Sequence, residues 1–312
     1  MPSEFELIAR YFTRATSHTV LGVGDDGALI APTPGQELVI SSDMLIEGTH
    51  FLADTDPEAL GWKTLAVNIS DIAAMGAQPR WATLAIAVPS APTFQWLDGF
   101  SRGWFACAEA FGIDLIGGDT TRGPRVFCVT IFGEVPAGMA LRRDGAQPGD
   151  SVWISGRPGR AALGLAHLQG RITLAAPLRG ECLAALQRPQ PRVALGLALR
   201  GIASAAIDVS DGLLADLGHI LEQSRCGARL HIPELPAAGL ERDCLLAGGD
   251  DYELAFTAAA AYDGNIAALA AKLQLPMTRI GEIVAAAAGE LVLCDDKGTV
   301  ITPARRGYDH FK

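Results

Sequence analysis

Strand-like apolar runs alternate along the chain with Ala-rich stretches of helical character. The apolar runs predict strands at 38–42, 81–88, 125–135, 151–155, 205–209 and 290–294. The Ala-rich stretches predict helices at 3–13, 57–75, 93–111, 159–168, 192–199, 213–223 and 264–273. This alternation predicts an α/β or α+β architecture.

A Gly-rich segment at 136–150 separates two apolar runs and closes on the turn sequence Pro148-Gly149-Asp150. The chain has 312 residues, and single hydrophobic cores stop growing at about 250–300 residues. We therefore predict two domains, at 1–137 and 138–312.

Composition narrows the class of protein. With 49% hydrophobic and 19% charged residues, the chain is typical of a globular protein. A net charge of −10 disfavours nucleic acid as a partner, because phosphates demand clustered Lys and Arg. No window resembles a membrane span, and Glu4 and Glu6 are atypical of a secretion signal, so a cytoplasmic location without membrane partners is expected. The six dispersed cysteines show no zinc spacing and predict free thiols.

The sequence Gly22-Val23-Gly24-Asp25-Asp26-Gly27 matches the dinucleotide fingerprint G-x-G-x-x-G. We reject that interpretation, because Asp25 and Asp26 would face the pyrophosphate where bare backbone amides are needed. A phosphate near these aspartates requires a cation between them.

Five further acidic motifs follow, at 41–43, 68–71, 117–123, 207–212 and 248–253. Each could be a helix cap or a turn. Asp71 is harder to explain in this way, because it falls in an apolar helical run with no Lys or Arg at helical spacing nearby, and its burial demands a partner.

The Ser-Asp pair recurs at Ser42, Ser70 and Ser210, beside apolar sequence each time. Two carboxylates about 4 Å apart repel by about 4 kcal/mol at an effective dielectric constant of about 20, so converging aspartates need divalent cations. Oxygen ligands favour Mg²⁺, which in turn lets an acidic site accept a nucleotide polyphosphate.

The usual nucleotide motifs are missing. The nearest approach to a P-loop, Gly61-Trp62-Lys63-Thr64, lacks its glycines, and the protein-kinase motifs are absent. The segment 156–159, Gly-Arg-Pro-Gly, either binds phosphate at a helix N-terminus or is only a connection. Any ATP site would therefore depend on metals.

The six motifs, in this order, resemble the thiamine-monophosphate kinase family. That family belongs to a superfamily with aminoimidazole ribonucleotide synthetase, selenophosphate synthetase and a hydrogenase-maturation protein. The opening Glu-Phe-Glu-Leu-Ile at 4–8 and the closing Gly-Tyr-Asp-His-Phe at 307–311 resemble the kinases rather than their relatives. The resemblance implies an N-terminal domain with a mixed sheet and helices that binds ATP and Mg²⁺ and forms the core of a homodimer. It also implies a C-terminal α/β sandwich that completes the ATP and substrate site.

The resemblance further implies ATP-dependent phosphorylation of thiamine monophosphate by direct in-line transfer. The implied metal ligands are Asp26, Ser41, Ser42, Asp43, Asp71, Asp119, Asp208 and Asp211. The implied ATP contacts are Gly118, Asp119, Arg143 and Ser210, and the implied catalytic residues are Asp43, Asp71, Asp208 and Arg143. The implied substrate contacts are His50, Asp250 and Tyr308.

The sequence departs from the family at two of these positions. Asp250 stands where the family generally has Glu, and Tyr308 stands where Trp is common. Another ATP-dependent enzyme of the superfamily and a non-catalytic sensor of Mg²⁺ or nucleotide are the alternatives. His50 and Arg143 disfavour the sensor. The sequence leaves open the number of Mg²⁺ ions and any requirement for K⁺.

Overall fold

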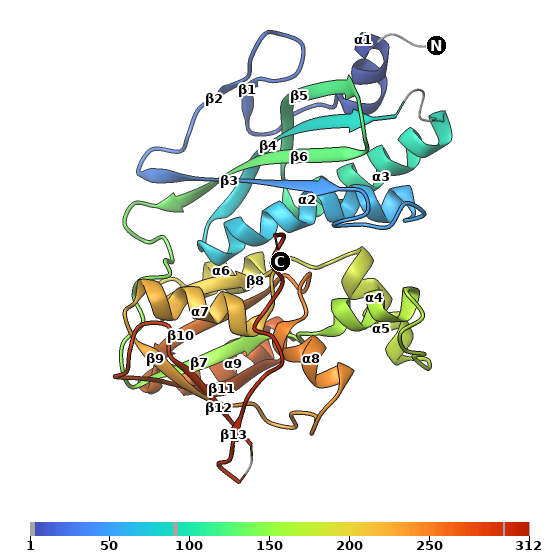
Figure 1. Ribbon diagram of the computed structural model, residues 1–312. Helices are drawn as coiled ribbons and strands as arrows, with labels where there is room; N and C mark the ends of the chain where they lie inside the picture. Colours follow the sequence, from blue (N-terminus) through green and yellow to red (C-terminus); the bar gives the residue numbers. More distant parts are fainter. Residues whose placement is uncertain (1–3, 90–92, 296, 312) are drawn as a thin grey trace. The chain divides into compact units, whose positions relative to one another are not determined.

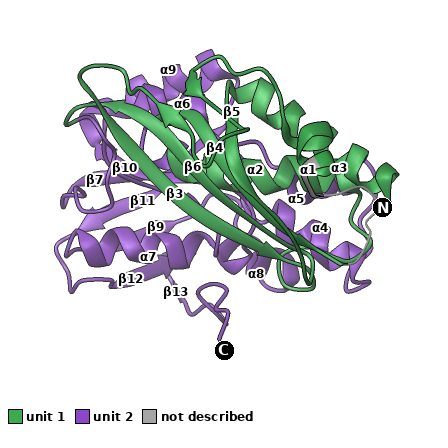
Figure 2. Ribbon diagram, turned by 90° about the horizontal axis from the view of Figure 1, so that it is seen from above, with its two compact units in different colours: residues 1–72, 77–138 green, residues 73–76, 139–312 purple. Residues whose placement is uncertain are grey.

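The computed structural model describes residues 4–89, 93–295 and 297–311 and divides the chain into two compact units (Figure 2). Unit 1 comprises Met1–Ile72 and Ala77–Gly138, and unit 2 comprises Ala73–Gly76 and Met139–Lys312. The roles predicted for the domains 1–137 and 138–312, in binding ATP, Mg²⁺ and substrate and in dimerisation, stay predictions. None of the helices in the described ranges combines the length and apolarity needed to cross a membrane.

Unit 1 is built on a four-stranded mixed sheet, as predicted (Figure 1). The strand order is β3-β6-β4-β5, in which only β4 and β5 run parallel. The strands are β3 (Gln36–Ile46), β4 (Gln78–Val88), β5 (Asp114–Arg122) and β6 (Val126–Pro136). A separate antiparallel pair consists of β1 (Thr19–Leu21) and β2 (Leu29–Ile30).

Two long helices, α2 (Pro57–Ala74) and α3 (Phe94–Phe111), are packed against β6 of this sheet. The Phe100 ring of α3 stacks on Phe127 of β6 with centroids 4.7 Å apart. Ile72 of α2 lies against Gly133 of the same strand. Phe127 and Gly133 are an even number of residues apart, so both helices cover the same face of the sheet.

The N-terminal helical prediction, 3–13, corresponds to α1 (Glu4–Leu7) and the π-helical turn η1 (Ile8–Phe12), while residue 3 lies outside the described ranges. The hydroxyl of Ser101 in α3 donates to the Tyr11 carbonyl at 2.7 Å and ties η1 to α3. The buried Asp114 carboxylate accepts from the backbone N–H groups of Ser17 and His18 and fixes the chain that follows.

Unit 2 is built on a seven-stranded sheet of order β13-β12-β9-β11-β7-β10-β8. Its strands are β7 (Asp150–Ser155), β8 (Ala203–Val209), β9 (Gly227–His231), β10 (Glu253–Ala259), β11 (Met277–Val284), β12 (Leu291–Cys294) and β13 (Val300–Ile301). Its helices are α4 (Arg160–Leu168), α5 (Leu178–Gln187), α6 (Val193–Leu199), α7 (Leu213–Gln223), α8 (Leu240–Ala247), the short 3-10 turn η2 (Ala260–Tyr262) and α9 (Asp263–Leu273). Apolar clusters formed with β8 and β10 make the core of this unit.

All the predicted strands and helices have counterparts, but several elements were not predicted. The unpredicted elements are β1, β2, β5, β9, β10, β11, β13, α5, α8 and η2. Strand β3 also runs to Ile46, four residues past the predicted end, so Asp43 lies inside a strand and does not cap a helix. The cap of α2 comes instead from Asp56, whose carboxylate accepts from the Ala59 N–H at 2.9 Å.

Helices α2 and α3 approach through two glycines. A Cβ placed on Gly103 would lie 1.8 Å from the Glu58 carbonyl oxygen, and one on Gly61 would lie 2.0 Å from the Phe100 carbonyl oxygen. Both clashes are with backbone, which cannot rotate away. The contact therefore accepts no side chain at either position.

We expect Gly103→Ala to destabilise the protein by about 1–3 kcal/mol, because the added methyl group forces the two helices apart. The measurement is the free energy of unfolding in urea. Gly218→Ala in α7 is the matched control, because no atom lies within 4 Å of the point that its Cβ would occupy, and alanine should stabilise that helix by up to about 1 kcal/mol. Equal effects of the two changes would show that the helix contact is not tight.

Candidate functional site

The Gly22–Gly27 segment joins two antiparallel strands, β1 and β2. No helix follows it, so the rejection of a dinucleotide fingerprint agrees with the local structure. Asp26 is exposed, and its backbone N–H donates to the Asp25 carboxylate at 2.9 Å. The loop presents both carboxyl groups at the surface of unit 1.

Two predicted metal ligands of unit 1, Ser41 and Asp71, lie in direct contact. The Ser41 hydroxyl of β3 donates to the Asp71 carboxylate of α2 at 2.5 Å. Two residues later in β3, the Asp43 N–H donates to the carboxamide oxygen of Asn68, which lies one helical turn before Asp71, at 3.0 Å. Asp71 is only half-buried, and a hydroxyl group is one of its partners. These two hydrogen bonds fix Asp43 and Asp71 close together across the β3–α2 interface.

Ser41 and Ser42 point to opposite faces of β3. Ser41 reaches α2, whereas the Ser42 hydroxyl lies 3.1 Å from both the Val129 carbonyl and the Thr130 hydroxyl of β6. Successive side chains alternate across a strand, so the two hydroxyls cannot bind the same cation from one face. Ser42 stays a predicted ligand, but its side chain is separated from the Ser41–Asp71 contact.

Gly118 and Asp119 lie inside β5, a strand that was not predicted and that continues to Arg122. Glycines at such a place commonly allow a ligand to approach the backbone. The structure gives Gly118 a different reason: its φ is 148°, and a Cβ there would lie 1.9 Å from the Leu84 carbonyl oxygen of β4. Asp119 is exposed and is in register with Ala85.

His50 closes the turn that follows β3. The imidazole Nδ1 of His50 accepts from the backbone N–H of Ile46 at 3.0 Å. The backbone N–H of His50 donates to the Ile46 carbonyl at 2.9 Å. A neutral imidazole that accepts at Nδ1 carries its proton at Nε2. The backbone therefore sets both the orientation and the tautomer of this predicted substrate contact.

In unit 2, the loop of Ser210, Asp211 and Gly212 connects β8 to α7 and is held by Asp216. The Asp216 carboxylate accepts all three backbone N–H groups of the loop at 3.0, 3.0 and 3.1 Å. Burial, with a smaller contribution from Asp211, raises the pKa of Asp216 to about 6, although the three hydrogen bonds oppose this rise. Asp216, and not Asp211, is therefore the residue whose carboxylate caps the backbone N–H groups of this loop.

Two other predicted segments converge on the same loop. The Asp250 N–H donates to the Ser210 carbonyl at 2.7 Å, and the Tyr308 N–H donates to the Asp211 carbonyl at 2.9 Å. Asp250 has φ 75°, a conformation that costs free energy for a residue other than glycine. Asp208, which is 5% exposed, precedes this loop at the end of β8. The structure thus brings Asp208, Ser210, Asp211, Asp250 and Tyr308 into one region of unit 2.

Asp251 decides between the two interpretations of the Gly156–Gly159 segment. Its buried carboxylate accepts from the Gly159 N–H at 2.7 Å and from the Ala161 N–H at 3.4 Å, at the N-terminus of α4. The backbone groups that a phosphate would use are already bound to a carboxylate of the chain. We conclude that the segment is a connection.

Arg143 lies beside the other end of α7. Its carbonyl accepts from the Ser224 hydroxyl, which follows the last residue of α7, at 2.8 Å. The loop at 210–212 precedes the first residue of the same helix. The Arg143 side chain is exposed, and its predicted contact with ATP stays a prediction.

The donor chemistry of these residues fits Mg²⁺. All the predicted ligands supply carboxylate or hydroxyl oxygen, which Mg²⁺ prefers, and the ion usually keeps several waters beside one or two carboxylates. Within the described ranges, no three His, Cys, Asp or Glu side chains gather in a way that could hold a metal by themselves. Water or substrate oxygen would complete the coordination of an Mg²⁺ ion held by one or two of these carboxylates.

Comparison with known families decides the relationship. The model for the N-terminal domain of AIR synthase related protein matches residues 24–135, and the model for the C-terminal domain matches residues 147–294. The chain belongs to this family. Proteins named thiamine-monophosphate kinase from Salmonella typhimurium strain LT2 and Escherichia coli strain K12 are each 45% identical over 99% of this chain and 98% of their own length.

Solved structures agree with the family over the whole fold. The crystal structure of thiamine-monophosphate kinase from Stenotrophomonas maltophilia K279a is 46% identical, with a TM-score of 0.82 over 95% of this chain and 96% of that chain. AaThiL complexed with AMPPCP and TMP is 28% identical, with a TM-score of 0.77 over 93% of this chain and 92% of that chain. The two-part α/β architecture expected from the resemblance is confirmed.

Sequence reasoning missed three residues that organise the site, namely Asn68, Asp216 and Asp251. Asp216 follows the Ser210 motif at a spacing that permits side-chain acceptance of the loop N–H groups, so a capping pattern could have found it. Asp251 stood in the acidic motif at 248–253, but its contact with a loop 90 residues away is long-range. Asn68 stood in the quoted motif, but its pairing with Asp43 is also long-range.

Asp251 provides a test of this organisation. Burial is the largest cause that raises its pKa well above the ordinary value. The folded chain thus retains this proton to higher pH than the unfolded chain does, and the associated stability is present below about pH 3.9 and lost as pH rises through the folded pKa. We expect Asp251→Asn, which cannot ionise at this position, to lack this fall in stability with rising pH. The free energy of unfolding of the variant, minus that of wild type, should therefore be higher at pH 8 than at pH 5.

The measurement is the free energy of unfolding in urea at both pH values. Glu241→Gln in α8 removes an exposed carboxyl group and is the control for lost charge. A pH-independent difference between wild type and Asp251→Asn would contradict the raised pKa.

Proposed function

We propose that the chain is an ATP-dependent kinase that phosphorylates thiamine monophosphate to thiamine diphosphate. The observation that carries the proposal is the 45% identity to proteins named thiamine-monophosphate kinase, which extends over 99% of the chain. The complex of AaThiL with AMPPCP and TMP, at 28% identity, supports both ligands. Similarity to HypE proteins, such as the ATP complex at 21% identity, concerns the fold alone.

The reaction is a direct in-line transfer. A phosphate oxygen of thiamine monophosphate forms a bond to the γ-phosphorus of ATP, the bond from that phosphorus to the β,γ-bridging oxygen breaks, and ADP leaves with the electron pair. The acceptor oxygen is largely ionised at neutral pH, so no strong general base is needed. Positioning and charge neutralisation therefore supply the catalysis.

The acidic residues serve to hold Mg²⁺, which when bound would neutralise the phosphates of both reactants. In unit 1 the proposed ligands are Asp26, Ser41, Ser42, Asp43, Asp71 and Asp119. In unit 2 they are Asp208 and Asp211. Asp43 and Asp71 support this role best, because hydrogen bonds fix the β3 and α2 segments that carry them. A requirement for K⁺ is tested separately, by comparing the activity in potassium buffer with that in sodium buffer.

The remaining predicted residues bind the organic ligands. Gly118, Asp119, Arg143 and Ser210 contact ATP, and Arg143 assists at the donor phosphates. His50, Asp250 and Tyr308 contact thiamine monophosphate. The Tyr308 ring is 47% exposed and can stack on a cationic thiazolium ring. Asp250 has a shorter side chain than Glu, and the hydrogen bond from its backbone N–H to the Ser210 carbonyl fixes the position from which that side chain extends.

Both units serve the same reaction, which we place in the cytoplasm. Unit 1 corresponds to the proposed domain 1–137, for ATP, Mg²⁺ and dimerisation, and unit 2 to the proposed domain 138–312, which completes the site. The rival function is a sensor that binds Mg²⁺ and nucleotide without transfer. The arrangement of Asp43 and Asp71 fits the kinase and the sensor equally well. A measurement of activity must therefore distinguish the two functions.

We expect Asp71→Asn and Asp208→Asn each to lower kcat/KM for ATP by about 100-fold or more, because each change removes a charged ligand of Mg²⁺. Higher Mg²⁺ should recover part of the activity. The measurement is formation of ADP and thiamine diphosphate. Asp54→Asn, at an exposed loop position of unit 1, is the control and should act as wild type.

The acceptor decides the function itself. ADP should form with thiamine monophosphate and not with thiamine or without acceptor. Equal ADP formation in all three reactions would refute the kinase, and binding of Mg²⁺ and ATP without turnover would favour the sensor.

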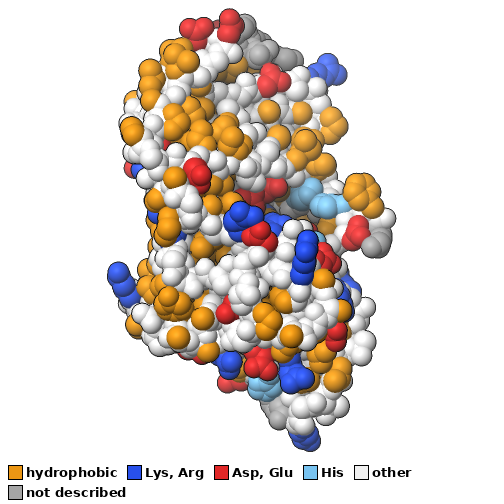
Figure 3. Space-filling view, turned by 90° about the vertical axis from the view of Figure 1, so that its left-hand side faces the viewer, with side chains coloured by type: hydrophobic (Ala, Val, Ile, Leu, Met, Phe, Trp, Pro, Cys, Tyr) orange, Lys and Arg blue, Asp and Glu red, His pale blue; other side chains and the backbone are white. Residues whose placement is uncertain are grey.

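A homodimer is also part of the proposal, and β3 supports it. Four large apolar side chains on the face of β3 away from α2 are exposed: Leu38 38%, Ile40 59%, Met44 49% and Ile46 37%. Strand β3 is an edge strand, and the exposed surface carries several hydrophobic patches (Figure 3). Residues of this kind are costly to leave in water, and a second copy would cover them.

We expect Ile40→Glu to convert the dimer to a monomer, because it places a charge in the middle of the apolar row. The measurement is the molar mass by light scattering after gel filtration. Val300→Glu is the matched control, because Val300 is 64% exposed in unit 2, and the dimer should survive it. A wild-type monomer, or a dimer that resists Ile40→Glu, would contradict the proposed interface.

A further inference from the structure

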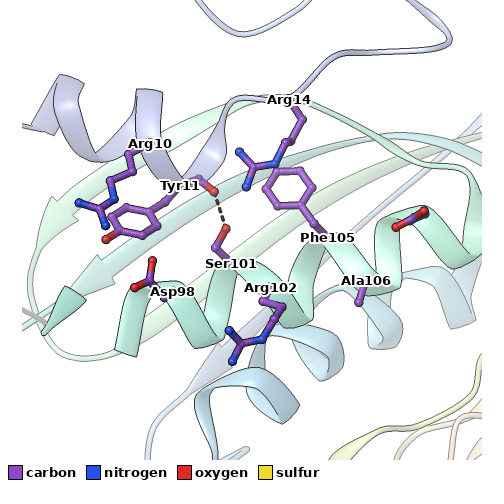
Figure 4. Close-up of a pocket in the computed structure, with 9 residues that line it drawn as sticks. Arg10, Tyr11, Arg14, Asp98, Ser101, Arg102, Phe105 and Ala106 are labelled. Atoms are coloured by element: carbon purple, nitrogen blue, oxygen red, sulfur yellow. Dashed lines mark hydrogen bonds between the residues drawn. The ribbon is translucent and has the colours of Figure 1, made fainter. Parts of the chain in front are cut away.

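A cavity in unit 1 involves none of the residues assigned to the kinase reaction. It has a volume of about 420 Å³ and lies between the N-terminal turn η1 and helix α3 (Figure 4). Small-molecule sites commonly range over about 300–1,000 Å³, so the cavity is large enough for a mononucleotide or a compound of similar size. Its lining residues are Arg10, Tyr11, Arg14, Asp98, Ser101, Arg102, Phe105, Ala106 and Glu109.

Two of its arginines are stacked on aromatic rings. The Arg10 guanidinium lies 5.1 Å from the Tyr11 ring centroid and 5.1 Å from that of Phe94. The Arg14 guanidinium lies 4.6 Å from the Phe105 ring centroid. Stacking holds a guanidinium by its face and leaves its N–H edges available, which is the edge geometry that binds phosphate in pairs of hydrogen bonds.

Neither stacked arginine forms an ion pair within the described ranges. Arg14 donates only to the neighbouring Thr13 carbonyl, at 2.9 Å, whereas the third arginine, Arg102, is paired with Glu58 at 2.7 Å. Both arginines line one cavity, and neither is paired with a carboxylate in the described part of the chain. Their charge remains available to an anion.

A buried hydroxyl lies beside a carboxylate at this cavity. Tyr11 is 2% exposed, and its hydroxyl forms no hydrogen bond of acceptable geometry. Burial is the largest cause that raises the Tyr11 pKa, with a contribution from the nearby Asp98, so the hydroxyl keeps its proton as a donor. The protonated Tyr11 hydroxyl and the Asp98 carboxylate therefore form a donor and acceptor pair at this side of the cavity.

The opposite charge is present as well. Asp98 and Glu109 line the same cavity from α3. Figure 4 shows the Tyr11 phenol and the Asp98 carboxylate directed toward one another. A simple anion would give these carboxylates no hydrogen-bond donor or cation to pair with. An amino group or a positive charge on the ligand would pair with them.

We propose that this cavity binds a phosphorylated ring compound whose ring carries an amino group or a positive charge. Arg10 and Arg14 hold the phosphate, and Asp98, with the Tyr11 hydroxyl beside it, accepts from the ring substituent. Adenine nucleotides and thiamine phosphates both have this chemistry. The proposal rests on the cavity alone and is independent of the kinase reaction.

The test observes Tyr11 directly. The chain has four tyrosines, so ¹³C-tyrosine NMR gives few signals, and Tyr11→Phe assigns the one of interest. The intact protein is titrated with ADP, thiamine diphosphate and pyrophosphate. We expect ADP, thiamine diphosphate or both to shift the Tyr11 signal, and the Arg10→Gln/Arg14→Gln double variant to weaken that binding at least about tenfold.

Two further variants test specificity. Asp98→Asn should weaken the ring compounds and leave pyrophosphate unchanged, and Arg229→Gln, an exposed arginine of β9, should change nothing. No Tyr11 shift at millimolar ligand, or a shift that persists in the double variant, would overturn the site. Equal binding of pyrophosphate with no effect of Asp98→Asn would overturn the assignment of a ring compound. The Tyr308 signal and ADP formation report separately on the proposed kinase site.

Discussion

Buried carboxylates that accept backbone N–H groups hold the loops of unit 2 in place. Asp216 satisfies three such groups between β8 and α7, and Asp251 satisfies the start of α4. An unsatisfied buried N–H costs about 1–3 kcal/mol, so these loops would not keep their conformation without the two side chains. The loop carbonyls then receive the Asp250 and Tyr308 N–H groups, and this brings three distant segments together.

This arrangement separates two kinds of aspartate that look alike in the sequence. Asp216 and Asp251 are engaged by backbone, and burial raises the pKa of each. Asp211 lies close to Asp216, and Asp208 precedes the same loop at the end of β8. The recurrence of acidic motifs predicts metal ligands, but part of this acidity serves the fold. Spacing alone could not divide the two groups, because the acceptor of a loop can be distant in sequence.

The same limit explains which elements could be predicted. Strands β4 and β6 show a plain apolar pattern, and the helices α2 and α3 are long, so all four were found. Strand β5 contains Gly117-Gly118, which resembles a turn until the close approach of β4 accounts for it. Strand β10 has the Ala-rich sequence Glu-Leu-Ala-Phe-Thr-Ala-Ala, and its extended form comes from pairing with β7 and β8 on both sides. In the site, the chemistry of Ser41 and Ser42 was predicted together, but the pleat sends them to opposite faces.

Charge distinguishes the proposed kinase residues from the proposed cavity at η1. The kinase residues are mainly carboxylates, so phosphate can approach them only with Mg²⁺ between. Arg10 and Arg14 carry the opposite charge and can bind phosphate directly. A chelator should therefore remove nucleotide from the first set while leaving the second set able to bind. This difference follows from the side chains alone and makes the two sites separable in one protein, even for ligands with the same phosphate group.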